Sequence, residues 1–583
     1  MSPFTGESQV NGPGVRATFY TGVVTSEQPK PQPDFSAVPG APLSGNPGLL
    51  AALAADLEAA GYRHDGVVQA VGESAMDALS REQPVPARRA LAVKERDDAL
   101  NPLSTLIRLF LLGGSVSAQR VEAALPTLGL AQATAIGLLE ADPDEPAFLR
   151  ASIDLRPHAS DADAELWVAS DVGAHHRPGV LRKDHVLGIG QASLTLAAVT
   201  ARRPAARALD LGVGCGIQTF HLLSHCDHVT ATDLSERALG FTRFNLLLNH
   251  EALGLDPQHL DARVSLLQGS LIEPVAGQRF DLIVSNPPFV ITPRRAGEGE
   301  EDRFTYRDGG MAGDTLVATL WHQLPEVMAE GATAQMLANW EIPAEQMLDG
   351  ASGSDPVAGT QVPGWAQRPA EWTAEGMECW VIQRDIETPE LYAETWLRDS
   401  SEVRSPEAAE RSYGAYLDDF ASRDVGGIGL GMVWLRRPAP GQPHGVGRVF
   451  EEITHAVAQP LGPTIGEAVW RQDAVAAVDP ALLHLVAADD VTVETHARPG
   501  EEHPQAILLR QGAGLRRVRL LSTAEAGIVS ACDGELPLGS LVNAVVALLE
   551  ATAPGSAPSA QELLESVTGL LQDGFLRFPA PGE

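Results

Sequence analysis

A glycine-rich turn between an apolar run and a helix-like segment constrains the fold of this chain most. The run at residues 206–211 is largely apolar, residues 210–216 read Asp-Leu-Gly-Val-Gly-Cys-Gly, and a helical pattern covers 218–224. Glycines at such a turn let the backbone pass from strand to helix and approach a ligand without Cβ clashes. The sequence therefore predicts an α/β domain that holds a ligand at this turn.

The spacing of these glycines differs from that of two common nucleotide-binding loops. The third glycine comes one residue too early for the dinucleotide fingerprint, and no Gly-Lys-Ser/Thr follows to grip phosphate. Two acids remain as ligand contacts: Asp210 at the turn, and Asp233 at the end of the apolar run 229–232. A carboxylate at the tip of the second strand accepts ribose hydroxyls, and Asp210 could hold a cationic amino-acid head. A ligand with ribose at one end and an ammonium at the other is S-adenosylmethionine.

A second motif, Asn-Pro-Pro-Phe at residues 286–289, directly follows the apolar run 280–284. Asn286 Oδ1 and the Pro287 carbonyl could accept the two N–H bonds of a planar nitrogen while Phe289 stacks on its plane. Such a nitrogen is a poor nucleophile, so the rate would come from orientation and from matching the charge of the transition state. The alternative is that Pro-Pro-Phe, including Pro288, only closes a strand. The upstream glycines favour the catalytic interpretation.

Taken together, the two motifs resemble those of class I S-adenosylmethionine-dependent methyltransferases over residues 192–437. The resemblance implies a Rossmann-like, seven-stranded α/β core with S-adenosylmethionine as its cofactor. Ser270 stands where the family commonly has Asp, and the alternative for it is a simple loop residue. The resemblance assigns cofactor binding to the following residues: Asp210, Gly212, Gly214, Gly216, Asp233, Leu234, Gly269, Ser270 and Asn286.

The resemblance also limits which kind of nitrogen is expected to receive the methyl group. Asn-Pro-Pro-aromatic marks enzymes of this family that methylate a glutamine amide or an exocyclic amine of adenine or guanine. Residues 305–314 resemble the glycine-rich element of the HemK/PrmC-like glutamine methyltransferases, in their archaeal and eukaryotic branch, and Val290 replaces the histidine of related ribosomal RNA enzymes. Both features favour a protein glutamine in a translation factor over an RNA or DNA base. Gln191, Tyr306 and Arg307 are candidate substrate contacts. A third alternative is a winged-helix regulator that binds the cofactor without catalysis.

Charge and composition limit the remaining classes of function. The 583 residues include 42 Lys+Arg and 76 Asp+Glu, which gives a formal net charge of -34. This acidity opposes nonspecific binding to nucleic acid. The longest apolar stretches are too short to cross a bilayer, and the cysteines are too widely spaced for a zinc knuckle. We expect a cytoplasmic protein with no metal and no membrane contact; the sequence leaves the oligomeric state open.

Changes in pattern along the chain predict four regions. Residues 1–43 are rich in Pro, Gly and Ser and are expected to form a disordered leader. Residues 44–172 read as helices followed by strands, the order of a winged helix, and 173–440 are expected to form the methyltransferase domain. Residues 441–583 again suggest a winged-helix-like module, with a first helix at 450–461.

Overall fold

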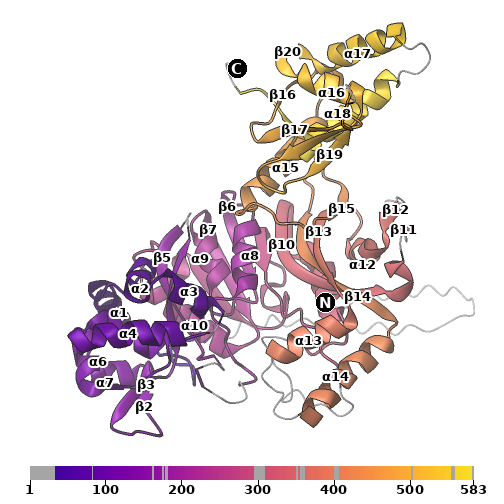
Figure 1. The fold of residues 1–583 in the computed structure, drawn as a ribbon. Helices are drawn as coiled ribbons and strands as arrows, with labels where there is room; N and C mark the ends of the chain where they lie inside the picture. Colours follow the sequence, from indigo (N-terminus) through magenta and orange to yellow (C-terminus); the bar gives the residue numbers. More distant parts are fainter. Residues whose placement is uncertain are drawn as a thin grey trace, which may run out of the picture. The chain divides into compact units, whose positions relative to one another are not determined.

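The computed structural model describes residues 33–580, apart from 82, 161–162, 174–175, 178–181, 295–308, 349–351, 355–360, 400–405, 501–502 and 553–557. The chain from Phe35 onward forms one compact unit. Its central element is an eight-stranded sheet of order β15-β13-β14-β10-β9-β6-β7-β8 (Figure 1). The strands are β6 (Ala205–Leu211), β7 (Cys226–Asp233), β8 (Val264–Gln268), β9 (Phe280–Ser285), β10 (Met328–Pro343), β13 (Glu378–Glu387), β14 (Val425–Arg436) and β15 (Arg448–Glu452).

The central sheet contains both parallel and antiparallel pairs of strands. Strands β8, β7, β6, β9 and β10 are parallel neighbours, whereas β14 runs antiparallel to both β10 and β13. Parallel strands require crossovers, which the helices between them supply. The carboxyl ends of β6, β7, β8 and β9 therefore meet at one edge of the sheet, where a ligand of an open α/β sheet binds.

The sheet is one strand larger than predicted, because β15 pairs in parallel with β13 at the edge. The prediction of a helix at 450–461 was wrong over its first residues, and the boundary expected at residue 440 falls inside the sheet-forming part of the chain. Residues Arg448–Glu452 satisfy backbone groups of β13 that would otherwise form an open edge. That long-range pairing outweighs the weak helical pattern.

Helices between the strands position the glycine turn and the substrate edge. Helix α10 begins after Ser235, whose side chain accepts a hydrogen bond from the Ala238 backbone N–H. Helix α11 ends at Gln323, because Pro325 follows and cannot continue an α-helix. The helices of this part are α8 (Gln191–Val199), α9 (Ile217–Leu223), α10 (Glu236–Leu248), α11 (Thr315–Gln323) and α12 (Gln367–Trp372), and a small hairpin joins β11 (Ser352–Ser354) and β12 (Gln361–Pro363).

The N-terminal part is helical and ends in strands, in the predicted order. It consists of α1 (Pro47–Ala59), α2 (His64–Val71), α3 (Glu73–Ser80), α4 (Val85–Asp97), α5 (Pro102–Leu106), β1 (Val116–Ser117), α6 (Ala118–Ala124), α7 (Leu130–Ala135), β2 (Leu139–Ala141), β3 (Phe148–Ala151), β4 (Asp154–Ser160) and β5 (Asp163–Ser170). A small sheet has the order β1-β3-β2, and β4 pairs with β5. The winged-helix interpretation remains a prediction.

The end of the predicted leader is packed rather than disordered. Phe35 and Val38 are buried in a cluster with Val213, Ala231 and Leu239 of the methyltransferase part. Burying these apolar side chains offsets the entropy of ordering the segment. The prediction of disorder up to residue 43 was therefore too long, and residues 1–32 lie outside the described residues.

Two further groups of elements complete the chain. Helices α13 (Pro389–Asp399) and α14 (Pro406–Ala421) are inserted between β13 and β14. The C-terminal part contains α15 (Gly462–Ala476), β16 (His484–Ala487), β17 (Val491–His496), β18 (Ala506–Gln511), β19 (Val518–Leu521), α16 (Thr523–Ser530), β20 (Asp533–Pro537), α17 (Leu538–Thr552), α18 (Ala560–Asp573) and β21 (Leu576–Arg577). This part has a hydrophobic core of its own, which includes Leu509, Ile528, Val567 and Leu571.

Candidate active site

The glycine turn joins β6 to α9 and lies against Asn286. Gly212, Gly214 and Gly216 have φ values of 82°, 57° and 102°, a region that residues with a Cβ rarely adopt. A Cβ at Gly212 would lie 3.8 Å from the Asn286 carbonyl oxygen. The two sequence motifs therefore meet in space, as the parallel pairing of β6 with β9 requires.

Asp210 lies at the end of β6, and only one of its two carboxylate oxygens has a hydrogen-bond partner among the described residues. Its side chain is buried, and Oδ2 accepts a hydrogen bond of 2.6 Å from Thr219 Oγ1. Oδ1 is buried and has no hydrogen-bond partner among the described residues. Burial, with a smaller contribution from the nearby Asp233, raises the pKa of Asp210 to about 7. A buried carboxylate oxygen without a partner fits the ammonium group of S-adenosylmethionine.

Asp233 ends β7 and organises the loops at the same edge. Its carboxylate accepts hydrogen bonds from the backbone N–H of Gly214 at 3.0 Å and of Ser235 at 2.8 Å. Burial raises the pKa of this carboxyl group. The Asp233 carbonyl accepts a bond of 3.0 Å from the Gly269 N–H, so the loop after β8 is held beside it. This arrangement fits the predicted role of Asp233 at a ribose.

Two predicted cofactor contacts flank Asp233 on the surface. Leu234 is 57% exposed, which leaves an apolar side chain in solvent directly after the acid. Ser270 is also exposed, at the end of the loop held by Gly269. An exposed leucine beside a polar loop offers one apolar face for a planar base. The predicted cofactor residues thus lie at the ends of β6 and β7 and on the loops that follow β6, β7, β8 and β9.

Asn286 presents an acceptor atom at this edge. It follows β9, whose last residue Ser285 donates a hydrogen bond of 2.8 Å to the Leu211 carbonyl. Asn286 Oδ1 is buried and has no hydrogen-bond partner among the described residues. An unpaired buried carbonyl costs free energy, and a ligand N–H would remove that cost. The atom is therefore suited to bind a substrate amide.

The rest of the motif lines a small cavity beside a glycine-rich segment. The cavity has a volume of about 10 Å³. Phe289 is half-buried and packs against two hydrophobic clusters of the central domain. Pro287 is buried. The cavity is lined by Pro288, Phe289, Val290, Gly309, Met311, Gly313, Asp314, Leu316 and Val317.

The predicted substrate contacts are only partly described. Gln191 is exposed at the start of α8, and its Nε2 donates to Thr195 Oγ1 at 3.5 Å. Gln218 in the first turn of α9 donates to the Ser193 carbonyl, which places α8 beside the helix that follows the glycine turn. Tyr306 and Arg307 lie outside the described residues. His185 is buried 3.6 Å from Asp171, and burial lowers its pKa.

Sequence reasoning missed an asparagine ladder that supports the glycine turn. Asn245 on α10 exchanges hydrogen bonds of 2.8 and 2.9 Å with the backbone of Ala169 and donates one of 2.9 Å to the Cys215 carbonyl. Asn249 exchanges bonds of 2.8 and 2.7 Å with Trp167 on the same strand. Two asparagines four residues apart lie on the same face of a helix, and this spacing in an apolar segment could have indicated a buried polar contact.

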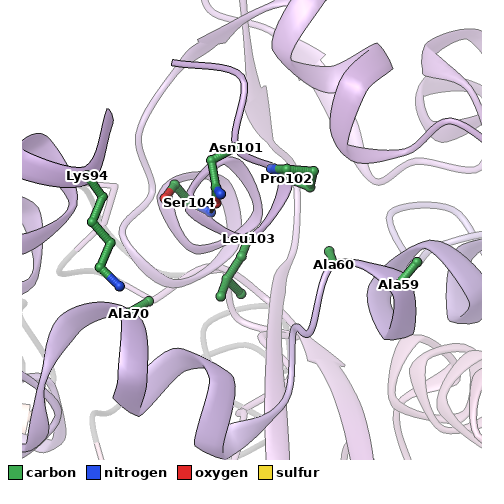
Figure 2. Close-up of a pocket in the computed structure, with 8 residues that line it drawn as sticks. All are labelled: Ala59, Ala60, Ala70, Lys94, Asn101, Pro102, Leu103 and Ser104. Carbon is green, nitrogen blue, oxygen red and sulfur yellow. Dashed lines mark hydrogen bonds between the residues drawn. The ribbon is translucent and has the colours of Figure 1, made fainter. Parts of the chain in front are cut away.

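A larger cavity lies in the N-terminal helical part (Figure 2). It has a volume of about 320 Å³ and contains none of the predicted site residues. Lys94 lies along one side of it, and its Nζ donates a hydrogen bond of 3.0 Å to the Gln69 carbonyl. The cavity is lined by Ala59, Ala60, Ala70, Lys94, Asn101, Pro102, Leu103 and Ser104.

Two absences apply to the described part of the chain. Within it, no group of three His, Cys, Asp or Glu residues is arranged to hold a metal ion. No helix in those same ranges is long and apolar enough to span a membrane.

Two segments of the chain match protein families. Residues 172–298 match the methyltransferase small domain, and residues 59–151 match a domain of unknown function, DUF7059. Among solved structures, a SAM-dependent methyltransferase from Thiobacillus denitrificans in complex with S-adenosyl-L-homocysteine is 17% identical with a TM-score of 0.21. That match covers 43% of this chain and 92% of that one.

Several curated relatives are glutamine methyltransferases. The release factor glutamine methyltransferase of Geobacter sulfurreducens is 39% identical over 90 residues, which are 15% of this chain and 28% of the relative. The ribosomal protein uL3 glutamine methyltransferase of Bradyrhizobium diazoefficiens is 31% identical over 153 residues, or 25% of this chain and 44% of the relative. The chain therefore spans less than half the length of these two relatives.

The strand order, the motif positions and the family match agree with one another. The sheet carries the glycine turn and Asn286 at the ends of neighbouring parallel strands, and the match at 172–298 contains the glycine turn, Asp233 and Asn286. The chain thus carries a class I S-adenosylmethionine-dependent methyltransferase domain, which contains the methyltransferase small domain at residues 172–298.

Proposed function

We propose that this protein methylates the side-chain amide nitrogen of a glutamine in a protein of the translation apparatus. The observation that carries the proposal is the buried, unpaired Oδ1 of Asn286 at the sheet edge that also holds Asp210 and Asp233. The curated relatives named for release factors and for ribosomal protein uL3 support the same acceptor class. Such an acceptor also accords with a cytoplasmic location.

The residues of the site would act mainly by orientation. S-adenosylmethionine supplies an electrophilic methyl group when it is bound. Asp210 would pair with its ammonium group and Asp233 with its ribose hydroxyls. Asn286 Oδ1 and the Pro287 carbonyl would accept the two amide N–H bonds of the target, and Phe289 would pack on its plane. Fixing the nitrogen in this way replaces solvent reorganisation with preformed contacts.

The proposed reaction needs no strong general base. As the amide nitrogen attacks the methyl carbon, its lone pair is withdrawn from the carbonyl, and positive charge develops on the N–H groups. The two acceptor oxygens stabilise that charge. The proton of the methylated nitrogen would then pass to water, so no residue of the chain has to remove it before the transfer.

An adenine or guanine amine in RNA or DNA is the alternative acceptor. Its exocyclic nitrogen has the same planar geometry and would use the same two oxygens. The formal net charge of -34 weakens this alternative, because the phosphate backbone of a nucleic acid would be repelled. The third alternative, a regulator that binds the cofactor without turnover, does not account for the substrate-side acceptor at Asn286.

Methyl transfer from tritiated S-adenosylmethionine tests the proposal. The acceptors are a purified bacterial release factor, purified uL3 and bulk RNA. We expect counts in protein that protease digestion removes and nuclease digestion leaves. Asn286→Ala should lower kcat about 100-fold, because one oriented acceptor is lost from the transition state. The dissociation constant of S-adenosylmethionine, measured by calorimetry, should stay within twofold.

Asn543→Ala is the matched control, since Asn543 is exposed on α17 in the C-terminal part. It should leave kcat and cofactor affinity at their wild-type values. Counts that only nuclease removes would favour the nucleic-acid acceptor. Cofactor binding without any transfer would favour the regulator. Wild-type turnover by Asn286→Ala would refute the assignment of the acceptor.

A further inference from the structure

The α13–α14 insertion emerges at the edge of the sheet that carries the candidate site. It lies between β13 and β14, which pair antiparallel with each other. The start of β14 pairs with the end of β10, at Pro343 and Val425. Because β10 runs parallel to β9, the insertion leaves the sheet on the side where Asn286 follows β9. Figure 1 shows α13 and α14 packed together next to β14.

The insertion forms its own hydrophobic cluster, and one member of that cluster comes from the motif loop. Ile291 lies two residues after Phe289 and is buried there. Its neighbours come from the insertion and from β14: Tyr392, Ala393, Tyr416, Phe420, Val425 and Ile428. The loop after Asn-Pro-Pro-Phe is therefore packed onto the insertion.

The hydroxyl of Tyr392 links this loop to the central sheet. It accepts a hydrogen bond of 2.9 Å from the Ile291 backbone N–H and another of 2.9 Å from Asn339 Nδ2 on β10. Tyr392, Ile291 and Asn339 are all buried. A buried N–H without a partner is costly, so the position of the Tyr392 oxygen fixes where Ile291 can lie.

A second link joins the insertion to the glycine-rich side of the small cavity. Arg423, directly after α14, pairs with buried Glu341 on β10 at 2.6 Å. A Cβ at Gly313 would lie 2.9 Å from Glu341 Oε1, and the Glu341 N–H donates to Asp314 Oδ2 at 2.8 Å. The motif loop and the glycine-rich segment form the two walls of the cavity. The loop is hydrogen-bonded to Tyr392 of the insertion, and the segment contacts Glu341, which pairs with Arg423.

We propose that Tyr392 is a positioning residue for methyl transfer, and that the α13–α14 insertion sets the acceptor side of the site. The inference rests on the proposed function. Tyr392 would fix the position of Ile291. The same contact would thereby keep the Pro287 carbonyl and Phe289 where they can contact the target amide. Its hydroxyl oxygen accepts hydrogen bonds from Ile291 and Asn339, which are not among the predicted cofactor residues, so we expect the affinity for S-adenosylmethionine to be independent of this hydroxyl.

The test compares Tyr392→Phe with Tyr413→Phe. Both changes remove one hydroxyl from the same insertion, but Tyr413 bonds only weakly, at 3.4 Å, to Glu394 within the insertion. For Tyr392→Phe we expect faster hydrogen–deuterium exchange in peptides covering residues 286–292. We also expect a fall of about tenfold in kcat with the release factor and an unchanged dissociation constant for S-adenosylmethionine. Tyr413→Phe should match the wild type in all three.

Each result decides the inference. Exchange that is unchanged in Tyr392→Phe would overturn it, whatever the activity. Faster exchange with wild-type kcat would also overturn it, because the loop would then move without consequence. A parallel loss of cofactor affinity would indicate a general structural role instead. If the wild type transfers no methyl group to any acceptor, the proposed function fails, while the exchange data still report on the Tyr392 link.

Discussion

At the scale of single residues, two side-chain oxygens at the candidate site, Asp210 Oδ1 and Asn286 Oδ1, are buried and have no hydrogen-bond partner within the described part of the chain. A folded protein retains such atoms at a cost of about 1–3 kcal/mol each. Both lie next to the glycine turn, and each suits one end of the reaction, a cationic head or an amide N–H. At both positions a ligand N–H group would remove the free-energy cost of an unpaired buried oxygen, which supports the assignment of the site.

The raised pKa of Asp210 predicts a pH dependence of cofactor binding. Below about pH 7 the buried carboxyl is neutral and attracts an ammonium group weakly; above it, the carboxylate is ionised. If only the ionised form binds, the affinity for S-adenosylmethionine should rise about eightfold from pH 6 to pH 7.5. Calorimetry at constant ionic strength measures this change.

Asp210→Asn is the control for that prediction, because it keeps the shape and removes the titrating group. Its affinity should be weak and nearly independent of pH over the same range, and any titration of the ligand itself would appear in both proteins. A pH dependence equal in the two proteins would show that Asp210 does not contact the cofactor.

Sequence patterns located most candidate residues, because the glycine turn and the Asn-Pro-Pro-Phe motif are local. Tyr392 and Asn339 could not be found in this way. They lie 101 and 53 residues from their partners in the hydrogen bonds that join Ile291, Tyr392 and Asn339. Only the folded chain shows that they meet beside the motif.

At the scale of elements, the glycine turn is held from behind by α10 and β5. Asn245 bonds both the Ala169 backbone and the Cys215 carbonyl, so it joins the N-terminal part to the turn itself. The sequence predicts strands at the end of residues 44–172, which agrees with β5, but it predicts no helix over the residues of α10. It did not predict their contact, since an asparagine within a helix has many possible partners.

Asn245→Ala should therefore weaken both folding and cofactor binding. The change leaves buried backbone groups of Ala169 and Cys215 without partners, which should lower the free energy of unfolding by about 3 kcal/mol. Urea denaturation measures this effect, and calorimetry should show weaker binding of S-adenosylmethionine. Asn543→Ala, on exposed α17, should change neither quantity. Wild-type cofactor affinity in a destabilised Asn245→Ala would mean that the turn does not depend on this link.

At the scale of the whole molecule, the C-terminal part is joined to the methyltransferase sheet by more than a linker. Strand β15 extends the sheet, and α15 contacts α8 through Gly462, where a Cβ would lie 2.2 Å from the Thr200 carbonyl oxygen. The sequence placed a boundary at residue 440 because the pattern changes there. Pairing between strands distant in sequence is not visible in such a pattern, so the continuation of the sheet was missed.

Arg436 at the end of β14 makes this connection testable. Its side chain is 11% exposed and pairs with Glu378 on β13 at 2.5 Å and with Asp473 on α15 at 2.6 Å. Asp473→Ala leaves the Arg436 guanidinium paired with Glu378 alone, and it removes the hydrogen bond that Asp473 accepts from the Gly445 N–H. We therefore expect the free energy of unfolding to fall by about 1–3 kcal/mol. Asp489→Ala breaks an exposed pair with Arg577, in which Asp489 is 87% exposed, and should cost less than about 0.5 kcal/mol. Equal urea midpoints for the two variants would show that the C-terminal part contributes no stability through Arg436.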